Sequence, residues 1–91
     1  MIARRVIFEG RVQGVGFRYT TKDIAKGFEV CGSVKNLPDG TVELDVMGER
    51  EEVEAFINEI AEESALAHHI KGMHVKNIPP LEGVKGFTIE R

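Results

Sequence analysis

The segment from residue 10 to residue 18 constrains the fold of this 91-residue chain more than any other feature. It reads Gly-Arg-Val-Gln-Gly-Val-Gly-Phe-Arg and lies between an alternating apolar pattern and a helical one. Gly14 and Gly16 allow the backbone to turn with its N–H groups pointing inward, and the following helix presents its positive end. Arg18 adds a guanidinium with fixed donors. The segment therefore predicts a strand, an anion-binding loop and a helix in direct succession.

Periodic apolar residues predict the elements on both sides of this loop. Residues 6–12 alternate with a period of two, which is typical of a half-buried strand. Apolar residues at helical spacing predict a first helix from about Phe17 to Phe28, and Gly27 is expected to end it. Residues 30–34 and 42–46 alternate on either side of a Leu-Pro-Asp-Gly turn, which predicts a hairpin.

The second half of the chain predicts another helix and two further strands. An acidic run at residues 49–52 suits the start of a helix. Its apolar stripe is made by Val53, Phe56, Ile57 and Ile60. Met73 and Val75 indicate a strand, and residues 87–89 indicate a short last one. The order βαββαββ predicts an α+β, ferredoxin-like split-βαβ sandwich, with a mainly antiparallel sheet, two helices on one face and a short extra C-terminal strand.

Composition bounds the kind of protein. Cys31 is the single cysteine and cannot close an intramolecular disulfide, so a reducing compartment is expected. No stretch approaches the roughly 18 apolar residues of a membrane span. We therefore expect one soluble, cytoplasmic domain over residues 1–91. A monomer is expected as well, although no residue pattern indicates the oligomeric state.

The net charge of −3 is unevenly distributed. Residues 1–35 carry seven Lys or Arg against three Asp or Glu, and residues 36–91 carry five against twelve. An acidic chain argues against a nucleic-acid partner, whereas a basic half that contains the glycine loop favours a small anion. Tyr19 occupies the third glycine position of a dinucleotide fingerprint, and no Gly-Lys-Ser/Thr follows, so the common nucleotide motifs are excluded.

Two motifs in register carry a resemblance to a known family. Residues 10–18 resemble the signature loop of the acylphosphatases, small hydrolases of the carboxyl-phosphate bond. Residues 32–36, Gly-Ser-Val-Lys-Asn, followed by Asp-Gly-Thr-Val-Glu at 39–43 and by Gly48, resemble the other motif of that family at the same spacing. The ending Gly-Phe-Thr-Ile at 86–89 is similar as well. The resemblance implies a hydrolase of small-molecule acyl phosphates that needs no cofactor and no metal. The composition adds that we expect neither a nucleic-acid partner nor a membrane partner.

The resemblance also implies roles for particular residues. Arg18 would hold the phosphoryl oxygens bidentately, and Asn36 would orient the attacking water through its amide. Backbone N–H groups would complete the substrate cradle, with binding residues Gln13, Gly14, Val15, Gly16, Phe17 and Arg18. The substrate's own phosphate is expected to take the proton, because the leaving carboxylate needs little acid assistance.

Two positions depart from the family pattern. Ser33 stands where a large aromatic residue is usual. We expect it on the strand face opposite Val34, so that the loss of the ring affects packing rather than chemistry. Glu29 stands where a glycine usually ends the first helix, and Gly27 is expected to have taken over that role.

The sequence leaves other functions open. The βαββαβ order also carries modules that stack single-stranded RNA on strand aromatics, but residues 41–47 offer none and expose Glu43 and Asp45. A second alternative is an accessory domain of a larger enzyme. We do not expect this, because the sequence ends soon after its last predicted strand. A catalytically weakened anion-binding or regulatory module on the same fold is the third.

A metal site is not expected at His68 and His69, whose rings should point in different directions.

Overall fold

A computed structural model describes residues 1–90 of the chain. The elements in chain order are β1 (Ile2–Gly10), α1 (Phe17–Ala25), β2 (Val30–Asn36), β3 (Val42–Gly48), α2 (Arg50–Asn58) with a π-helical extension (Glu59–Glu63), a 3-10 turn (Ala67–His69), β4 (Ile70–Ile78) and β5 (Phe87–Glu90). The five strands form one sheet in the order β4-β1-β3-β2-β5. All neighbours are antiparallel except β2 and β5, which are parallel. The α+β ferredoxin-like prediction is therefore confirmed.

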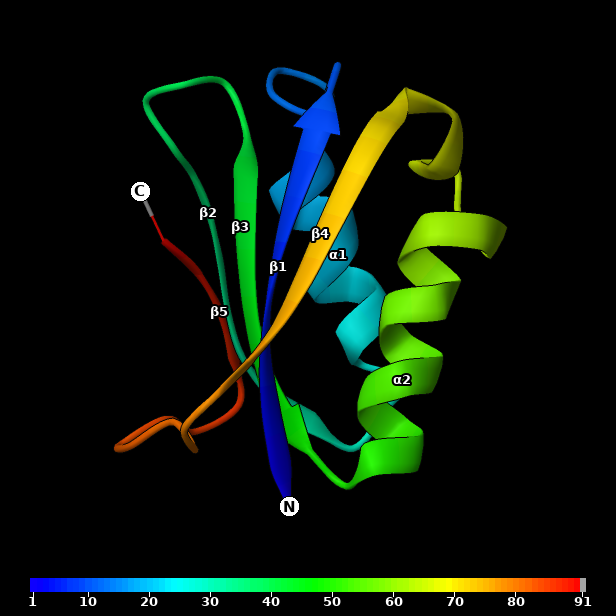
Figure 1. Cartoon of the computed structure of the whole chain (residues 1–91). Helices are drawn as coiled ribbons and strands as arrows, with labels where there is room; N and C mark the ends of the chain where they lie inside the picture. The colour runs from blue at the N-terminus through cyan, green and yellow to red at the C-terminus, as the bar shows by residue number, and fades with distance from the viewer. Residues whose placement is uncertain (91) are drawn as a thin grey trace.

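Both helices cover the same face of the sheet, and the core lies between the two layers (Figure 1). The period-two pattern of β3 produces this arrangement, because Val42, Leu44 and Val46 all point toward the helices and are buried. The apolar stripe of α2 meets them with Val53, Phe56, Ile57 and Ile60, all buried as predicted. Burial of each such side chain contributes about 1.5–3 kcal/mol to folding.

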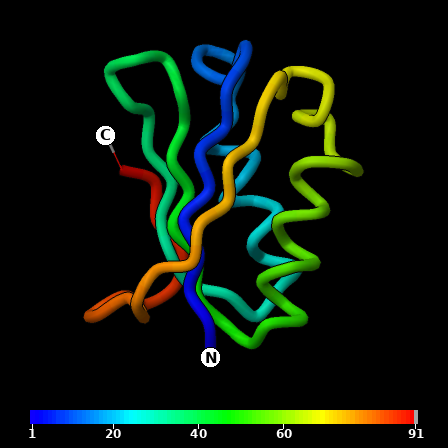
Figure 2. The backbone as a smooth tube through the Cα atoms, in the orientation of Figure 1, coloured from blue at the N-terminus to red at the C-terminus, as the bar shows by residue number. Residues whose placement is uncertain are grey.

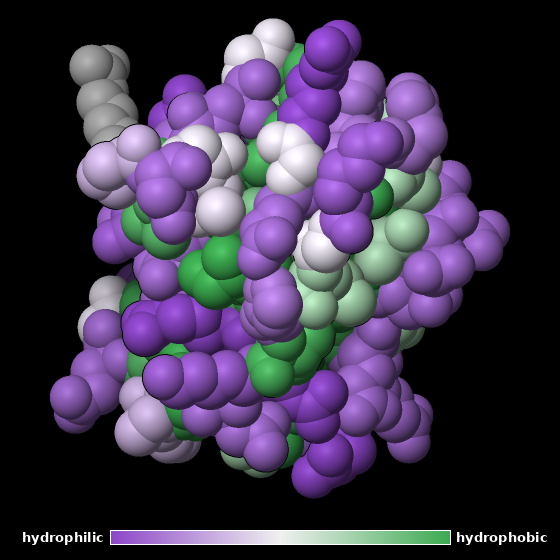
Figure 3. Space-filling model, turned by 45° about the horizontal axis from the view of Figure 1, so that its top comes forward, coloured by the Kyte–Doolittle hydropathy of each residue, from purple (hydrophilic) through white to green (hydrophobic). Residues whose placement is uncertain are grey.

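The opposite face of the sheet carries paired charges. Arg5 on β1 donates two hydrogen bonds to Asp45 on β3, at 2.8 and 3.0 Å, and its Nε lies 3.3 Å from Glu43. These hydrogen bonds and the negative charge of Asp45 raise the pKa of the Arg5 guanidinium. Figure 3 shows the molecule with its top turned forward: hydrophilic residues cover most of that surface, and hydrophobic residues show near its centre. On the open face, β1 and β3 thus present charged side chains where a platform for stacked bases would need aromatic ones.

The glycine loop and the β2–β3 turn lie at the same end of the sheet (Figure 2). The turn is closed by a hydrogen bond from the N–H of Gly40 to the carbonyl of Leu37, at 3.1 Å, and by one from Leu37 to Thr41, at 2.9 Å. The hairpin predicted from the Leu-Pro-Asp-Gly sequence is thus confirmed. Its tip brings the end of β2 beside the start of α1.

The first helix ends differently from the prediction. It stops at Ala25, three residues before Phe28. The N–H groups of Gly27 and Phe28 donate to carbonyls three residues back, so the chain leaves the helix through tight 3-10 turns. Gly27 does not adopt a left-handed conformation, so the prediction that it acts as a glycine cap is wrong.

The first and fourth strands begin or end at other residues than the alternating apolar pattern of the sequence predicted. β1 ends at Gly10, and Val12 lies outside the strand yet is fully buried. β4 extends well beyond the predicted Met73 and Val75, which are 39% and 45% exposed. Both point toward the helical layer, in register with buried residues of β1, but β4 is an edge strand and the helices do not cover it fully. Within residues 1–90, no helix is long and apolar enough to cross a membrane.

Candidate active site

The loop between β1 and α1 presents free backbone donors. Gly14 and Gly16 have φ angles of 78° and 77°, a left-handed conformation that glycine adopts without strain. Gly16 is the N-cap of α1, no side chain caps this helix end, and its first turn holds no acidic residue. Within residues 1–90, no backbone carbonyl accepts a hydrogen bond from the N–H groups of residues 13–17. Backbone donors arranged in this way at a helix N-terminus are typical of loops that bind anions.

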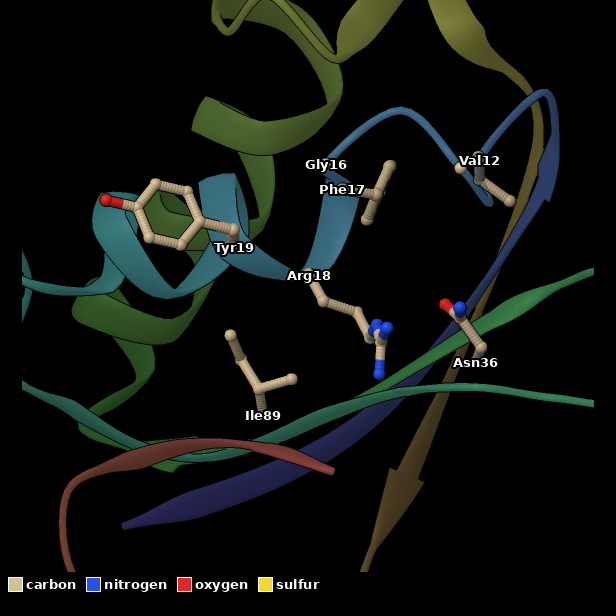
Figure 4. A pocket seen from close by; sticks show the side chains of 8 residues that line it. Val12, Gly16, Phe17, Arg18, Tyr19, Asn36 and Ile89 are labelled. Carbon is tan, nitrogen blue, oxygen red and sulfur yellow. The ribbon is translucent and has the colours of Figure 1, made fainter. Parts of the chain in front are cut away.

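Arg18 and Asn36 reach the same hollow from two elements. The hollow has a volume of about 200 Å³. It is lined by Val12, Gly14, Gly16, Phe17, Arg18, Tyr19, Asn36 and Ile89. In Figure 4 the guanidinium of Arg18, from α1, and the amide of Asn36, from the end of β2, point toward one another. Two polar side chains separated by eighteen positions in the sequence thus face one space beside the glycine loop.

A hydrogen bond to the last strand holds the Arg18 side chain. Its Nη1 donates to the carbonyl oxygen of Glu90 in β5, at 2.9 Å. A guanidinium has five donors in a planar fork, so this bond leaves others available for the oxygens of an anion. The bond orients Arg18 without neutralising it, because a carbonyl carries no charge.

The hollow brings together most of the predicted binding residues, but not all of them. Gly14, Gly16, Phe17 and Arg18 line it. Gln13 and Val15 do not: Val15 packs against the core, and the amide of Gln13 donates to the carbonyls of the β2–β3 turn. A role in binding for their backbone N–H groups stays a prediction.

Phe17 anchors the start of α1 next to the loop. It is 2% exposed, and its ring lies 5.0 Å from that of Phe8 in β1, centroid to centroid. Tilted aromatic pairs at this distance are favourable, so the first residue of the helix is fixed to the sheet. This packing holds the helix N-terminus and Arg18 in place above the hollow.

Sequence reasoning missed four contributions to the site. Val12, Tyr19 and Ile89 line the hollow, and Glu90 supplies the acceptor for Arg18. Val12 was predicted as a residue of the first strand, whereas the strand ends two positions earlier at Gly10, which places Val12 in the loop beside the hollow. The pairing of residues 87–90 with β2 joins distant segments and leaves no local sequence pattern. Ile89 could therefore not be placed beside Arg18 from the sequence.

Both departures from the family pattern lie outside the hollow. Ser33 is half-buried, pairs in register with Asp45 and Thr88, and faces away from the helices, as predicted. Glu29 has no left-handed conformation, and its N–H donates to a carboxylate oxygen of Glu52 at 2.7 Å. A glycine is therefore not required at that position.

The histidines are arranged differently from the expectation. The rings of His68 and His69 approach each other, with centroids 4.3 Å apart, so the prediction that they diverge is wrong. His74 lies 2.6 Å from a carboxylate oxygen of Glu9 on β1. In the part of the chain that the structure describes, no three or more His, Cys, Asp or Glu gather as a potential metal site.

The fold and the loop define a class of protein: an α+β sandwich whose first strand–loop–helix unit presents backbone N–H donors and an arginine at one end of the sheet. Comparisons with known proteins place the chain within this class. The model of the acylphosphatase family matches residues 4–89. An acylphosphatase of Methanospirillum hungatei JF-1 is 43% identical, over 94% of this chain and 93% of the relative.

Solved structures agree with the family match. The crystal structure of an acylphosphatase from Bacillus subtilis has a TM-score of 0.89 and 34% identity, and the match covers all of both chains. Full-length HypF, in a phosphate- and nucleotide-bound form, has a TM-score of 0.83 and 32% identity, over 99% of this chain but 12% of HypF. The chain belongs to the acylphosphatase family. It is a hydrolase of that class, and the membership supports the hydrolysis of acyl phosphates.

Proposed function

We propose that this chain cleaves the carboxyl-phosphate bond of acyl phosphates by direct attack of water, with Arg18 and Asn36 as the catalytic residues and with no metal ion. One observation carries the proposal. The glycine loop, the Arg18 guanidinium and the Asn36 amide surround a single hollow of about 200 Å³. This set combines donors for a phosphoryl group with one amide that can hold a water molecule.

The loop and Arg18 bind the phosphoryl end of the substrate. Its oxygens accept hydrogen bonds from the N–H groups of residues 13–18 and from the guanidinium. Because the glycines and the fixed N-terminus of α1 hold these donors in position beforehand, they stabilise the charge of the transition state without reorganisation. The binding residues in this proposal are Gln13, Gly14, Val15, Gly16, Phe17 and Arg18.

Asn36 positions the nucleophile. Its carbonyl accepts a hydrogen bond from the water, whose oxygen attacks phosphorus in line with the carboxylate that leaves. The new oxygen–phosphorus bond forms as the phosphorus–carboxylate bond breaks, and a phosphoryl oxygen takes the proton of the water. The products are a carboxylate and inorganic phosphate. An amide is not a base, so the proposal assigns no proton transfer to Asn36.

The test is the hydrolysis of benzoyl phosphate by the purified chain in the presence of a chelator. We expect Arg18→Ala to lower kcat/KM by about 100- to 1,000-fold, as for other preorganised donors, and to weaken inhibition by inorganic phosphate. We expect Asn36→Ala to lower kcat and to leave phosphate inhibition intact. Arg11→Ala is the matched control, because Arg11 is exposed and does not line the hollow. Equal rates for Arg18→Ala, Asn36→Ala and the parent chain would contradict the proposal, as would a requirement for added metal.

We further propose a single acylphosphatase-like domain over residues 1–91 that acts as a cytoplasmic monomer without a cofactor, a nucleic-acid partner or a membrane partner. The charged open face of the sheet supports the absence of a nucleic-acid partner, because it carries paired charges rather than aromatic side chains. Light scattering after size exclusion tests the oligomeric state, and the mass of a dimer would contradict it.

A further inference from the structure

We infer that Ile89 and Tyr19 receive the acyl group of the substrate, and that the preferred substrates are acyl phosphates with an apolar acyl group. This inference rests on the proposed function, because it extends the same hollow from the phosphoryl end to the leaving group. It assigns specificity to two residues that take no part in the chemistry.

Both residues are apolar in large part, exposed, and placed next to an anion site. Ile89 is 38% exposed and Tyr19 is 72% exposed, and both line the hollow with Arg18 and Asn36. In Figure 4 the side chain of Ile89 points from β5 into the space between Arg18 and Tyr19. Exposed apolar groups beside convergent polar groups are typical of ligand sites.

The sheet fixes the position of Ile89. In the parallel ladder between β2 and β5, Ile89 pairs with Val34, and Val34 lies two residues before Asn36 on β2. The next residue, Glu90, accepts the hydrogen bond from Arg18. Ile89 is therefore fixed beside the strand that bears Asn36 and next to the residue that holds the Arg18 side chain.

The geometry of in-line displacement gives the direction of the acyl group. The attacking water and the leaving carboxylate occupy opposite sides of the phosphorus. Figure 4 shows Asn36 on one side of the Arg18 guanidinium, and Ile89 and Tyr19 on the other. If the phosphorus lies beside the guanidinium, as the proposed function requires, a water held by Asn36 leaves the side of Ile89 and Tyr19 for the departing carboxylate.

The chemistry on that side of the hollow favours an apolar group. Among residues 1–90, Arg18 is the single charged residue that lines the hollow, and in the proposed function its guanidinium is bound to the phosphoryl oxygens. Ile89 offers a branched aliphatic surface. The ring of Tyr19 extends along α1, away from Arg18 in Figure 4, and an exposed tyrosine changes rotamer on the ps–ns timescale, so it can close over an acyl group.

The experiment compares kcat/KM for acetyl phosphate and benzoyl phosphate in the parent chain, Ile89→Thr and Tyr19→Ser. We expect the benzoyl-to-acetyl ratio to fall by about 3- to 10-fold in each variant, because Tyr19→Ser removes an aromatic contact and Ile89→Thr replaces an apolar group with a hydroxyl. Val75→Thr is the matched control, since Val75 is 45% exposed on the other edge strand, and its ratio should equal that of the parent.

Each outcome decides between the inference and the proposed function. A benzoyl-to-acetyl ratio of kcat/KM that is the same in both variants as in the parent overturns the inference, even if both substrates are hydrolysed more slowly. A parent chain that hydrolyses neither substrate overturns the proposed function instead. A series of acetyl, butanoyl and hexanoyl phosphate with the parent chain needs no variant: kcat/KM should rise with chain length, and a fall would overturn the inference.

Discussion

The Nε2 atom of Gln13 donates a hydrogen bond of 2.8 Å to the carbonyl oxygen of Leu37, the residue that follows Asn36. The same atom donates a second bond of 2.8 Å to the carbonyl of Thr41. The Gln13 amide thus ties the loop that leads to Arg18 to the turn that follows Asn36. The relative position of the two proposed catalytic residues depends on this bridge, and small errors in such positions are costly to catalysis.

Replacement of Gln13 should therefore affect stability and turnover together. Gln13→Ala removes two part-buried hydrogen bonds, so we expect a loss of about 1–3 kcal/mol in the free energy of unfolding. We also expect a lower kcat, because the turn that carries Asn36 is no longer held against the loop. Urea denaturation and benzoyl phosphate hydrolysis measure the two effects. Gln13→Met keeps the length of the side chain without the donor, and parent-like kcat in both variants would disprove the role of the bridge.

Gly16 tests whether the loop needs its left-handed backbone. Its φ is 77°, and an added Cβ would meet no atom within 4 Å, so a substitution meets strain but no clash. We expect Gly16→Ala to cost about 1–2 kcal/mol of stability and to weaken inhibition by inorganic phosphate. Gly16→Asn should be milder, because asparagine tolerates this conformation better than alanine. If the alanine variant were as stable and as sensitive to phosphate as the parent, the loop would not require glycine here.

The fold was predictable where one face of an element is buried. Because side chains alternate along a strand, a single pattern in β3 determines both its existence and which residues enter the core, as Leu44 shows. The glycine loop was predictable for a related reason. Its residues are consecutive, and the conformation of Gly16 follows from local chemistry.

What sequence reasoning missed depends on contacts between distant segments. No local pattern reports that β5 lies parallel to β2, which places Ile89 beside Arg18. The reach of the Gln13 side chain to the β2–β3 turn spans more than twenty positions and has no periodic signature. The predicted end of α1 was wrong for another reason. The chain leaves the helix through 3-10 hydrogen bonds, and these do not require Gly27 to adopt a left-handed conformation.

Thr21 offers a test of the core. It is fully buried in α1, and its Oγ1 has no hydrogen-bond partner. A buried hydroxyl without a partner costs free energy, so we expect Thr21→Val, which is nearly the same shape, to raise the free energy of unfolding by about 1 kcal/mol. Thr20→Val is the control at a half-buried position, with an expected change within about 0.5 kcal/mol. A less stable Thr21→Val chain would show that the hydroxyl does have a favourable partner.

Asp39 links the stability of the β2–β3 turn to pH. Its Oδ1 accepts hydrogen bonds from the hydroxyl of Thr41, at 2.6 Å, and from the N–H of Thr41, at 3.0 Å. These bonds favour the carboxylate and hold the pKa of Asp39 below its ordinary value of 3.8. A carboxyl group with a lowered pKa stabilises the fold at pH values above 3.8, and this contribution is lost as the pH falls through the lowered value.

Thr41→Val should distinguish the contribution of the Thr41 hydroxyl to the lowered pKa of Asp39 from that of the Thr41 backbone N–H. The variant keeps the backbone N–H and loses the shorter hydrogen bond, so we expect the pKa of Asp39, measured by NMR titration of its carboxyl carbon, to move back toward 3.8. The difference in unfolding free energy between the parent chain and the variant should be greatest near neutral pH and shrink below pH 3.8. Thr88→Val, on β5, is a control that leaves the turn intact. An Asp39 pKa identical in the parent chain and in Thr41→Val would mean that the hydroxyl does not set it, and the backbone N–H would then carry the whole effect.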